Sequence, residues 1–174
     1  KNLTWEQFTK VNYFLHDLTG AKPVLSVSRN YPFNENYTHV LGYVSEASEK
    51  DILNSEVIKS KHVPGLKVGK TGLEKTFENE LIGTNGVQRY EVNAYGKRIS
   101  QLDHTDGLNG KSIQLTIDTE IQKLCNELLK NRAGSISVMD IYTGEIVAMQ
   151  SSPSFDPNLF LFGINQDDWQ LIRN

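Results

Sequence analysis

The last third of the chain carries a pattern that cannot complete a domain by itself. Residues 113–117 alternate apolar and polar side chains, which is typical of a half-buried strand. The sequence Thr119-Glu120-Ile121-Gln122 predicts the start of a capped helix. A hairpin is then predicted, with its turn at 142–145 and its strands at 135–141 and 146–150. One strand, one helix and one hairpin leave sheet edges and apolar side chains uncovered, so residues 111–174 predict the beginning of a larger fold.

The helix that begins at Thr119 is predicted to place its apolar side chains on one face. Cys125 lies on that face, so we predict a buried and unreactive thiol. Because Cys125 is the only cysteine of the chain, the sequence excludes an intrachain disulfide and a cysteine-based zinc site. The predicted apolar face consists of Ile121, Leu124, Cys125, Leu128 and Leu129.

Residues 1–110 combine short helices and short strands, with no repeated unit. Serine and threonine caps followed by glycine stops predict the helices, and Thr71-Gly72-Leu73-Glu74 has the form of a capping box. The polar, glycine-bearing stretch 103–111 is predicted as a domain boundary. This mixture predicts an α+β fold. Helices are predicted over 4–20, 48–53 and 71–82, strands over 23–30, 87–93 and 97–102, and a loop over 59–70.

The charge of the chain argues against nucleic acid as a partner. Lysine and arginine number 18 and aspartate and glutamate 21, which gives a net charge of −3. A protein that binds phosphates by neutralising them is normally basic. The lysines of residues 59–70 are accordingly predicted to form a solvated face and not an anion site.

Familiar catalytic and metal-binding patterns are incomplete in this sequence. Residues 65–71 resemble a phosphate-binding loop but have three residues between the two glycines where that loop has four. Glu78 and Glu80 are two positions apart on a predicted helix, so their carboxylates point to different faces. No two histidines have the sequence spacing that is typical of metal ligands. We therefore expect no cofactor and no metal. The four histidines are His16, His39, His62 and His104.

Two further tripeptides match motifs of serine enzymes that react with penicillin. Lys70-Thr71-Gly72 has the form Lys-Thr-Gly, and Ser28-Arg29-Asn30 has the form Ser-x-Asn. The third motif of these enzymes is Ser-x-x-Lys, in which a lysine lies one helical turn from the nucleophile. No serine of this chain has a lysine three residues later. We interpret both tripeptides as structural and predict no catalytic residue in this chain.

These tripeptides occur within a longer ordered set of segments, and the set resembles the class B penicillin-binding proteins of the elongation type. Each segment is weak by itself, but together they span about residues 30–160. The matching segments are 29–32 (Arg-Asn-Tyr-Pro), 39–44 (His-Val-Leu-Gly-Tyr-Val), 69–74 (Gly-Lys-Thr-Gly-Leu-Glu), 83–86 (Gly-Thr-Asn-Gly), 91–96 (Glu-Val-Asn-Ala-Tyr-Gly), 115–118 (Leu-Thr-Ile-Asp), 143–149 (Thr-Gly-Glu-Ile-Val-Ala-Met) and 152–160 (Ser-Pro-Ser-Phe-Asp-Pro-Asn-Leu-Phe).

The resemblance implies part of a periplasmic D,D-transpeptidase that is anchored in the bacterial inner membrane and cross-links the stem peptides of peptidoglycan. In such enzymes a serine attacks the substrate carbonyl and an acyl-enzyme forms, which β-lactams trap. Residues 1–110 would belong to the pedestal, also called the dimerisation or non-penicillin-binding domain, truncated at its N-terminus. Residues 111–174 would begin the transpeptidase domain. The nucleophile would lie beyond Asn174, and this segment would be inactive. The anchor helix would be absent from these residues.

The resemblance also implies partners, and it leaves one alternative open. The parent protein would contact a lipid-II-polymerising glycosyltransferase and a scaffold protein of the elongation complex. The alternative is a stand-alone binding module that keeps the pedestal pattern without an enzyme. In either case the uncovered elements of residues 112–150 predict that this chain by itself self-associates or has a mobile C-terminal third.

Overall fold

The structure of the chain is a computed structural model that describes residues 3–18, 20–21, 23, 27–95 and 98–173. It divides into two compact units, Lys1–Asn30 and Tyr31–Asn174. The first unit holds helix α1 (Trp5–Tyr13), which begins with the predicted capping box between Thr4 and Gln7. This helix ends at Tyr13 and not near Gly20 as predicted. Part of the strand predicted over 23–30 lies outside the described residues, and 27–30 form no strand.

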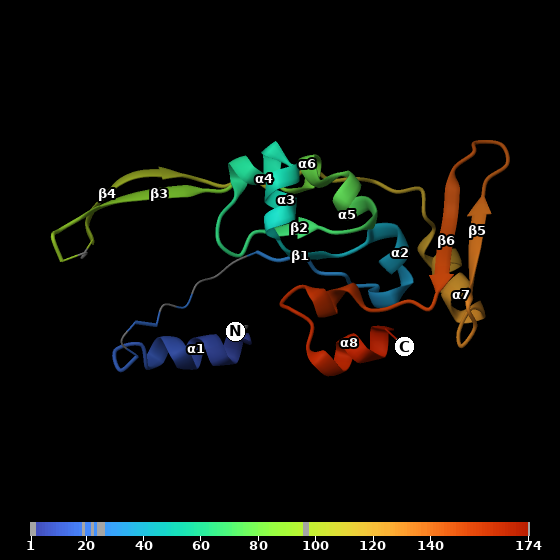
Figure 1. Cartoon of the computed structure of the whole chain (residues 1–174), viewed down its shortest axis with the longest axis horizontal. Helices are drawn as coiled ribbons and strands as arrows, with labels where there is room; N and C mark the ends of the chain where they lie inside the picture. The colour runs from blue at the N-terminus through green and yellow to red at the C-terminus, as the bar shows by residue number, and fades with distance from the viewer. Residues whose placement is uncertain (1–2, 19, 22, 24–26, 96–97, 174) are drawn as a thin grey trace. The chain divides into compact units, whose positions relative to one another are not determined.

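The second unit opens with short elements joined by tight turns (Figure 1). Strand β1 pairs antiparallel with β2 in a small two-stranded sheet. Ser48 caps α3 through a reciprocal bond with Asp51, which confirms the predicted helix start. The elements in order are η1 (Asn34–Asn36), α2 (Thr38–Leu41), β1 (Val44–Glu46), α3 (Glu49–Asn54), α4 (Glu56–Lys61), β2 (Lys67–Gly69), α5 (Gly72–Thr76) and α6 (Glu78–Leu81).

Two predictions for this region are wrong. The stretch 59–70 is not one loop, because it contains the end of α4 and all of β2. The helix predicted over 71–82 is two short helices, α5 and α6, that meet at Phe77. Thr71 is the N-cap residue of α5, but its side chain makes no capping hydrogen bond. The sequence pattern therefore predicted the helix start correctly but wrongly predicted a capping hydrogen bond from the threonine side chain.

Strands β3 (Val87–Val92) and β4 (Arg98–Thr105) form an antiparallel ribbon, which confirms the strands predicted near these positions. Every residue of β4 is exposed. The pairing register shifts twice, so that Leu102 and Ile99 are left over on β4. The predicted boundary stretch 103–111 therefore begins inside this strand.

The last part of the chain contains the predicted helix and hairpin but not the predicted strand (Figure 1). Residues 113–117 adopt no strand, although Thr116 and Asp118 each make one hydrogen bond to the backbone of β6. The single backbone hydrogen bond, from the Asp118 amide to the Val147 carbonyl, is too few to pair these residues with β6 as a strand. The helix cap is Asp118, which accepts from the Glu120 and Ile121 amides, and not Thr119. The elements are α7 (Thr119–Leu128), β5 (Gly134–Met139), β6 (Ile146–Ser152), η2 (Pro157–Phe160) and α8 (Gln166–Arg173).

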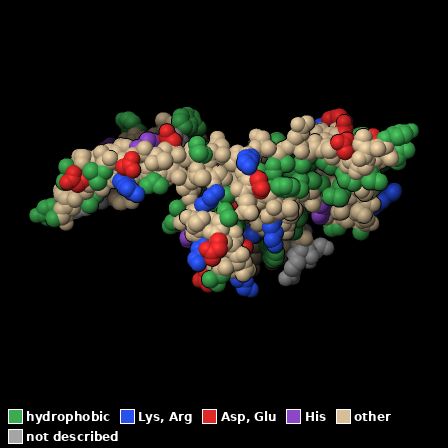
Figure 2. All heavy atoms as spheres, turned by 90° about the horizontal axis from the view of Figure 1, so that it is seen from above, with side chains coloured by type: hydrophobic (Ala, Val, Ile, Leu, Met, Phe, Trp, Pro, Cys, Tyr) green, Lys and Arg blue, Asp and Glu red, His purple; other side chains and the backbone are tan. Residues whose placement is uncertain are grey.

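The elements and their pairing confirm the predicted α+β class, with three separate two-stranded antiparallel sheets among the described residues. The core of the second unit is small, and a cluster of Tyr31, Val44 and Leu161 joins residues from both ends of that unit. Figure 2 shows apolar side chains on the surface, including the outer ends of both hairpins, where Tyr95 and Tyr142 are almost fully exposed. Within the described part of the chain, no helix has the length and apolar content needed to cross a bilayer.

Candidate functional site

The Lys70-Thr71-Gly72 tripeptide lies in a turn between β2 and α5 that packs against the end of α2. Gly42 and Gly72 have φ angles of +76° and +60°, in the left-handed region that favours glycine. A Cβ atom on Gly42 would lie 2.0 Å from the Thr71 carbonyl oxygen, and one on Gly72 would lie 2.6 Å from the Gly42 nitrogen. The two backbones therefore approach each other closely at this turn, and a side chain at either glycine would collide with the other segment.

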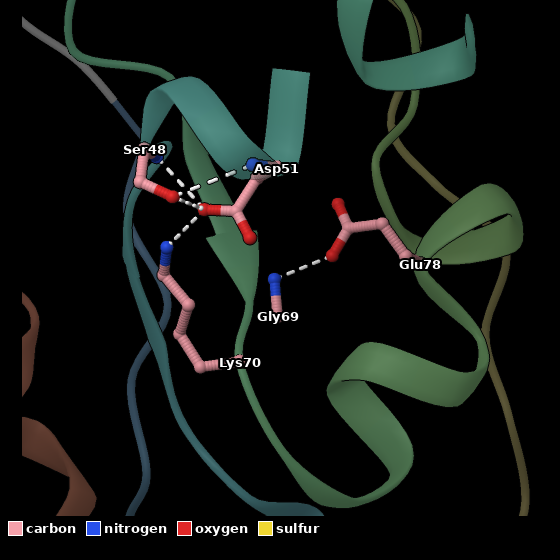
Figure 3. A network of polar contacts seen from close by, with 5 residues as sticks. All are labelled: Ser48, Asp51, Gly69, Lys70 and Glu78. Carbon is pink, nitrogen blue, oxygen red and sulfur yellow. Dashed lines mark hydrogen bonds and ion pairs between the residues drawn. The ribbon is translucent and has the colours of Figure 1, made fainter. Parts of the chain in front are cut away.

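The lysine of this tripeptide is held by an acidic side chain, as Figure 3 shows. The Lys70 ammonium forms an ion pair with Asp51, whose carboxylate also accepts from the Ser48 amide and hydroxyl at the start of α3. The side chains of Lys70 and Asp51 are only 19% and 28% exposed. The predicted solvated lysine face is therefore wrong at Lys70, because the fold brings the cap of α3 beside the end of β2.

The partners of Asp51 lower the pKa of its carboxyl. Burial alone would raise the pKa, but hydrogen bonds from Lys70 and Ser48 outweigh it and lower the pKa from 3.8 to about 2. Nearby, the Gly69 amide donates to the Glu78 carboxylate (Figure 3). An amide that a phosphate would need is thus directed at an acidic side chain, which argues against the phosphate-loop reading of residues 65–71. Glu80, on the same helix as Glu78, is exposed.

Hydrogen bonds between residues remote in sequence join residues 31–43 to residues 118–161, and we call this site the joint. Asn158 exchanges two hydrogen bonds with the backbone of Tyr31, at 3.0 and 2.9 Å. The Thr38 hydroxyl donates to the Phe155 carbonyl, and His39 Nε2 lies 3.0 Å from the Pro153 carbonyl oxygen. These contacts span more than 110 positions of sequence, so the joint determines how the two ends of the second unit are held together.

Aromatic rings and hydroxyl groups complete the joint. Tyr43, Phe155 and Phe160 pack against one another, with the Tyr43 and Phe160 ring centroids 4.2 Å apart. The Tyr31 hydroxyl donates to the buried Glu74 carboxylate at 3.2 Å, which connects the joint to α5. Such aromatic contacts add about 0.5–1.5 kcal/mol each beyond the buried area. The joint is therefore a packed interface as well as a set of hydrogen bonds.

A pocket of about 720 Å³ lies beside the joint. Its lining includes Asn36 from the first side of the joint and residues of α7 and β6 from the other. Charged residues of both signs line it: Glu35 and Glu127 are acidic, and Lys123, Lys130 and Arg132 are basic. Because the two signs are mixed and nearly balanced, the lining does not identify a class of ligand.

Side chains elsewhere in the chain, at Asp140, His104 and Cys125, have local surroundings. Asp140 accepts from the Thr143 and Tyr142 amides in the hairpin turn, and these bonds lower the pKa of its carboxyl. His104 pairs with Asp106 at 2.7 Å at the base of the β3–β4 ribbon. Cys125 is 4% exposed, which confirms its predicted burial.

The apolar face predicted for α7 is only partly correct. Of that set Cys125 and Leu129 are buried, whereas Leu124 and Leu128 are 52% and 59% exposed. The place of a leucine in the core is taken by Gln122, whose side chain is fully buried. The sequence placed Gln122 in a predicted helix cap and Asn158 in a family-like segment. It predicted neither their burial nor their contacts, because an amide side chain gives no periodic signal and its partners are remote in sequence.

Comparison with known proteins identifies the class to which this fold belongs. Residues 1–115 match the family described as the Penicillin-binding Protein dimerisation domain. The chain belongs to the class B penicillin-binding proteins and carries their dimerisation, or pedestal, domain, which confirms the resemblance read from its sequence.

Within that class the similarity is to penicillin-binding protein 2, MrdA. The chain is 36% identical to the peptidoglycan D,D-transpeptidase MrdA of Haemophilus influenzae over 177 residues and to that of Escherichia coli K12 over 175 residues. Each alignment covers 99% of this chain but only 27% and 28% of the relative. The chain thus spans little more than a quarter of the length of these relatives.

Solved structures agree with the sequence comparison. The complex between PBP2 and MreC from Helicobacter pylori superimposes with a TM-score of 0.81 at 31% identity, covering 100% of this chain and 32% of that one. PBP2 of Pseudomonas aeruginosa in complex with WCK 5153 gives a TM-score of 0.66 at 33% identity, covering 88% of this chain and 30% of that one. The fold described above is therefore the fold of these proteins over the matched region.

Proposed function

We propose that this chain is the non-catalytic pedestal segment of a peptidoglycan D,D-transpeptidase, together with the first elements of the transpeptidase domain. The observation that carries the proposal is the joint. Residues 31–43 are hydrogen-bonded and packed against 118–161, so a pedestal built on the first segment would hold a catalytic domain that begins with the second. We place the boundary between the two domains at 110/111, close to the end of the family match at residue 115.

The chemistry of the parent protein would then take place outside these residues. The Lys70-Thr71-Gly72 turn is occupied by backbone packing and by the Asp51 ion pair, so it offers no open lysine to a substrate. The sequence has no Ser-x-x-Lys element. A serine nucleophile supplied by the parent would form the acyl-enzyme with a stem peptide or a β-lactam. The relatives named as D,D-transpeptidases support this assignment.

We further propose that the parent acts at the periplasmic face of the inner membrane during cell elongation. A scaffold protein of the MreC type is the partner that the similar Helicobacter pylori complex suggests. The second partner, expected from the sequence resemblance, is the glycosyltransferase of the elongation complex. The pedestal would serve both by spacing the catalytic domain from the membrane.

Intact-mass spectrometry after incubation with a β-lactam tests the proposal. The chain is compared with its parent extended beyond Asn174. A single adduct on the extended protein alone is the expected result. An adduct on this chain would place a reactive serine within it and overturn the non-catalytic assignment. No adduct on either, with a panel of β-lactams, would favour the stand-alone binding module.

A further inference from the structure

The buried carboxamide of Gln122 occupies the centre of the joint. Gln122 lies in the first turns of α7, and its side chain is 0% exposed. Its Nε2 atom lies 2.7 Å from the Asn36 carbonyl oxygen and 2.9 Å from the Met149 carbonyl oxygen. Its Oε1 atom accepts from the Met149 amide at 2.9 Å. One side chain of α7 therefore binds both the end of η1 and strand β6.

A second buried glutamine extends this arrangement. Gln150, 1% exposed, accepts from Gln122 Nε2 at 2.8 Å and donates from its own Nε2 to Asn126 Oδ1 at 2.8 Å. The polar atoms thus form a chain from the Asn36 carbonyl through both glutamines to Asn126 on α7. A buried polar group without a partner costs about 1–3 kcal/mol. Because the members depend on one another, loss of one leaves several partners unsatisfied.

The three side chains nearest to glutamine in size or chemistry do not reproduce what Gln122 does at this position. Glutamate has the length but would direct carboxylate oxygens at the carbonyl oxygens of Asn36 and Met149. Leucine has a similar size but neither donates nor accepts. Asparagine keeps the amide but is one methylene shorter, so it cannot span from the Met149 backbone to Asn36.

We propose that Gln122 is a positioning residue that fixes residues 36–42 on the α7–β6 element, so that these segments open and close as one unit. The inference rests on the proposed function for its meaning, because the unit would connect the pedestal to the transpeptidase domain. The common opening of these segments is a property of this chain and can be measured on it. If Gln122 had a purely local role, it would stabilise α7 against β6 and leave residues 36–42 unaffected.

Native-state hydrogen exchange separates these two roles. In the unmodified chain, the amides of Leu41, Gly42 and Met149, all hydrogen-bonded, are expected to exchange through one opening reaction with the same urea dependence. Different opening free energies and urea dependences for residues 41–42 and for Met149 would overturn the proposal. This measurement needs no variant, so it decides the question even if every substitution prevents folding.

The Gln122→Leu variant tests whether loss of the carboxamide speeds amide exchange in both segments. Exchange is expected to accelerate roughly tenfold or more at Leu41 and Gly42 as well as at Met149, as the loss of buried hydrogen bonds implies. The milder Gln122→Asn variant is read in the same way if Gln122→Leu does not fold. Glu127→Gln, an exposed change on the same helix, is the matched control and should leave these amides within about twofold. Acceleration confined to 119–129 and 146–152 would overturn the proposal. Since the test uses no β-lactam, its failure is distinct from failure of the transpeptidase assignment.

Discussion

Asn158 and Tyr31, 127 positions apart, pair through their amide groups as two residues of a β-ladder would. The Tyr31 amide donates to Asn158 Oδ1 at 3.0 Å, and Asn158 Nδ2 donates back to the Tyr31 carbonyl at 2.9 Å. The Tyr31 side chain is 4% exposed and belongs to the core cluster with Val44 and Leu161. A side-chain amide therefore substitutes for a strand at the point where the two ends of the second unit meet.

This pairing predicts the effect of a single atom exchange at residue 158. Asn158→Asp keeps the acceptor for the Tyr31 amide but replaces the donor by an oxygen that faces the Tyr31 carbonyl. We expect the free energy of unfolding to fall by about 1–3 kcal/mol at pH 7, measured by urea denaturation. Asn54→Asp, at an exposed position of α3, is the control and should change it by less than about 0.5 kcal/mol. Equal stability of the two variants would show that the pairing contributes nothing.

The contact between Gly42 and Gly72 gives a second prediction. Gly72→Ala combines a φ of +60° with a Cβ atom 2.6 Å from the Gly42 nitrogen, and backbone cannot move aside as a flexible side chain can. We expect a loss of about 2–5 kcal/mol or a failure to fold. Thermal or urea unfolding followed by circular dichroism measures it.

Gly65→Ala is the matched control for that substitution. Gly65 also has a left-handed φ, +80°, but a Cβ atom there would have no heavy atom within 4 Å. Its cost should be limited to the conformational strain of about 1–2 kcal/mol. If both variants lost the same stability, the close approach of the two backbones in the Lys70-Thr71-Gly72 turn would be contradicted.

The ion pair between Lys70 and Asp51 predicts how stability depends on pH. The pKa of Asp51 is lowered to about 2 in the folded chain, so the folded state binds a proton less readily than the unfolded state. The resulting stability is fully present above the unfolded value near 3.8 and is lost as the pH falls toward 2. After allowance for solvent screening, the contribution is on the order of 1 kcal/mol.

Comparison of the unmodified chain with Asp51→Asn tests this dependence. Urea denaturation between pH 7 and pH 2.5 should show the difference in unfolding free energy shrinking as the pH falls. Glu49→Gln, at an exposed residue of the same helix, is the control and should give a difference that varies little over this range. A difference between Asp51→Asn and the unmodified chain that stays constant across the range would contradict the lowered pKa.

Local sequence signals predicted several helix starts and the hairpin, whereas contacts between remote residues could not be predicted from the sequence. The caps at Thr4 and Ser48 and the hairpin turn at 142–145 depend on residues within a few positions, and the structure confirms each. The strand at 113–117 failed because alternation shows which side chains are half-buried but not whether a neighbouring strand edge is available. Lys70 was misjudged because its partner Asp51 is 19 positions away.

The joint shows the same limit at the level of the site. Ordered family-like segments indicated that residues 29–32, 39–44 and 152–160 matter, but not that they touch. Gln122 and Asn158 carry much of the joint, and an amide side chain is usually a surface residue. Only the fold, which brings backbone groups of remote segments beside them, converts these amides into buried partners.

The outer face of α7 gives the last prediction. Leu124 and Leu128, one helical turn apart, are 52% and 59% exposed, and Ile121 continues the same stripe at 36%. An exposed row of apolar side chains favours contact with another apolar surface, and no other described residue of the chain buries these three. We expect this chain to self-associate, with an average mass in sedimentation that rises with concentration.

The Leu124→Glu and Leu128→Glu double variant should remain monomeric and fold with stability changed by about 0.5 kcal/mol or less per site, because both positions are exposed. Leu53→Glu, at a 78% exposed leucine of α3, is the matched control and should associate as the unmodified chain does. A compact monomer at all concentrations for the unmodified chain would mean that α7 needs no cover, and association that survives the double variant would assign the contact to another surface.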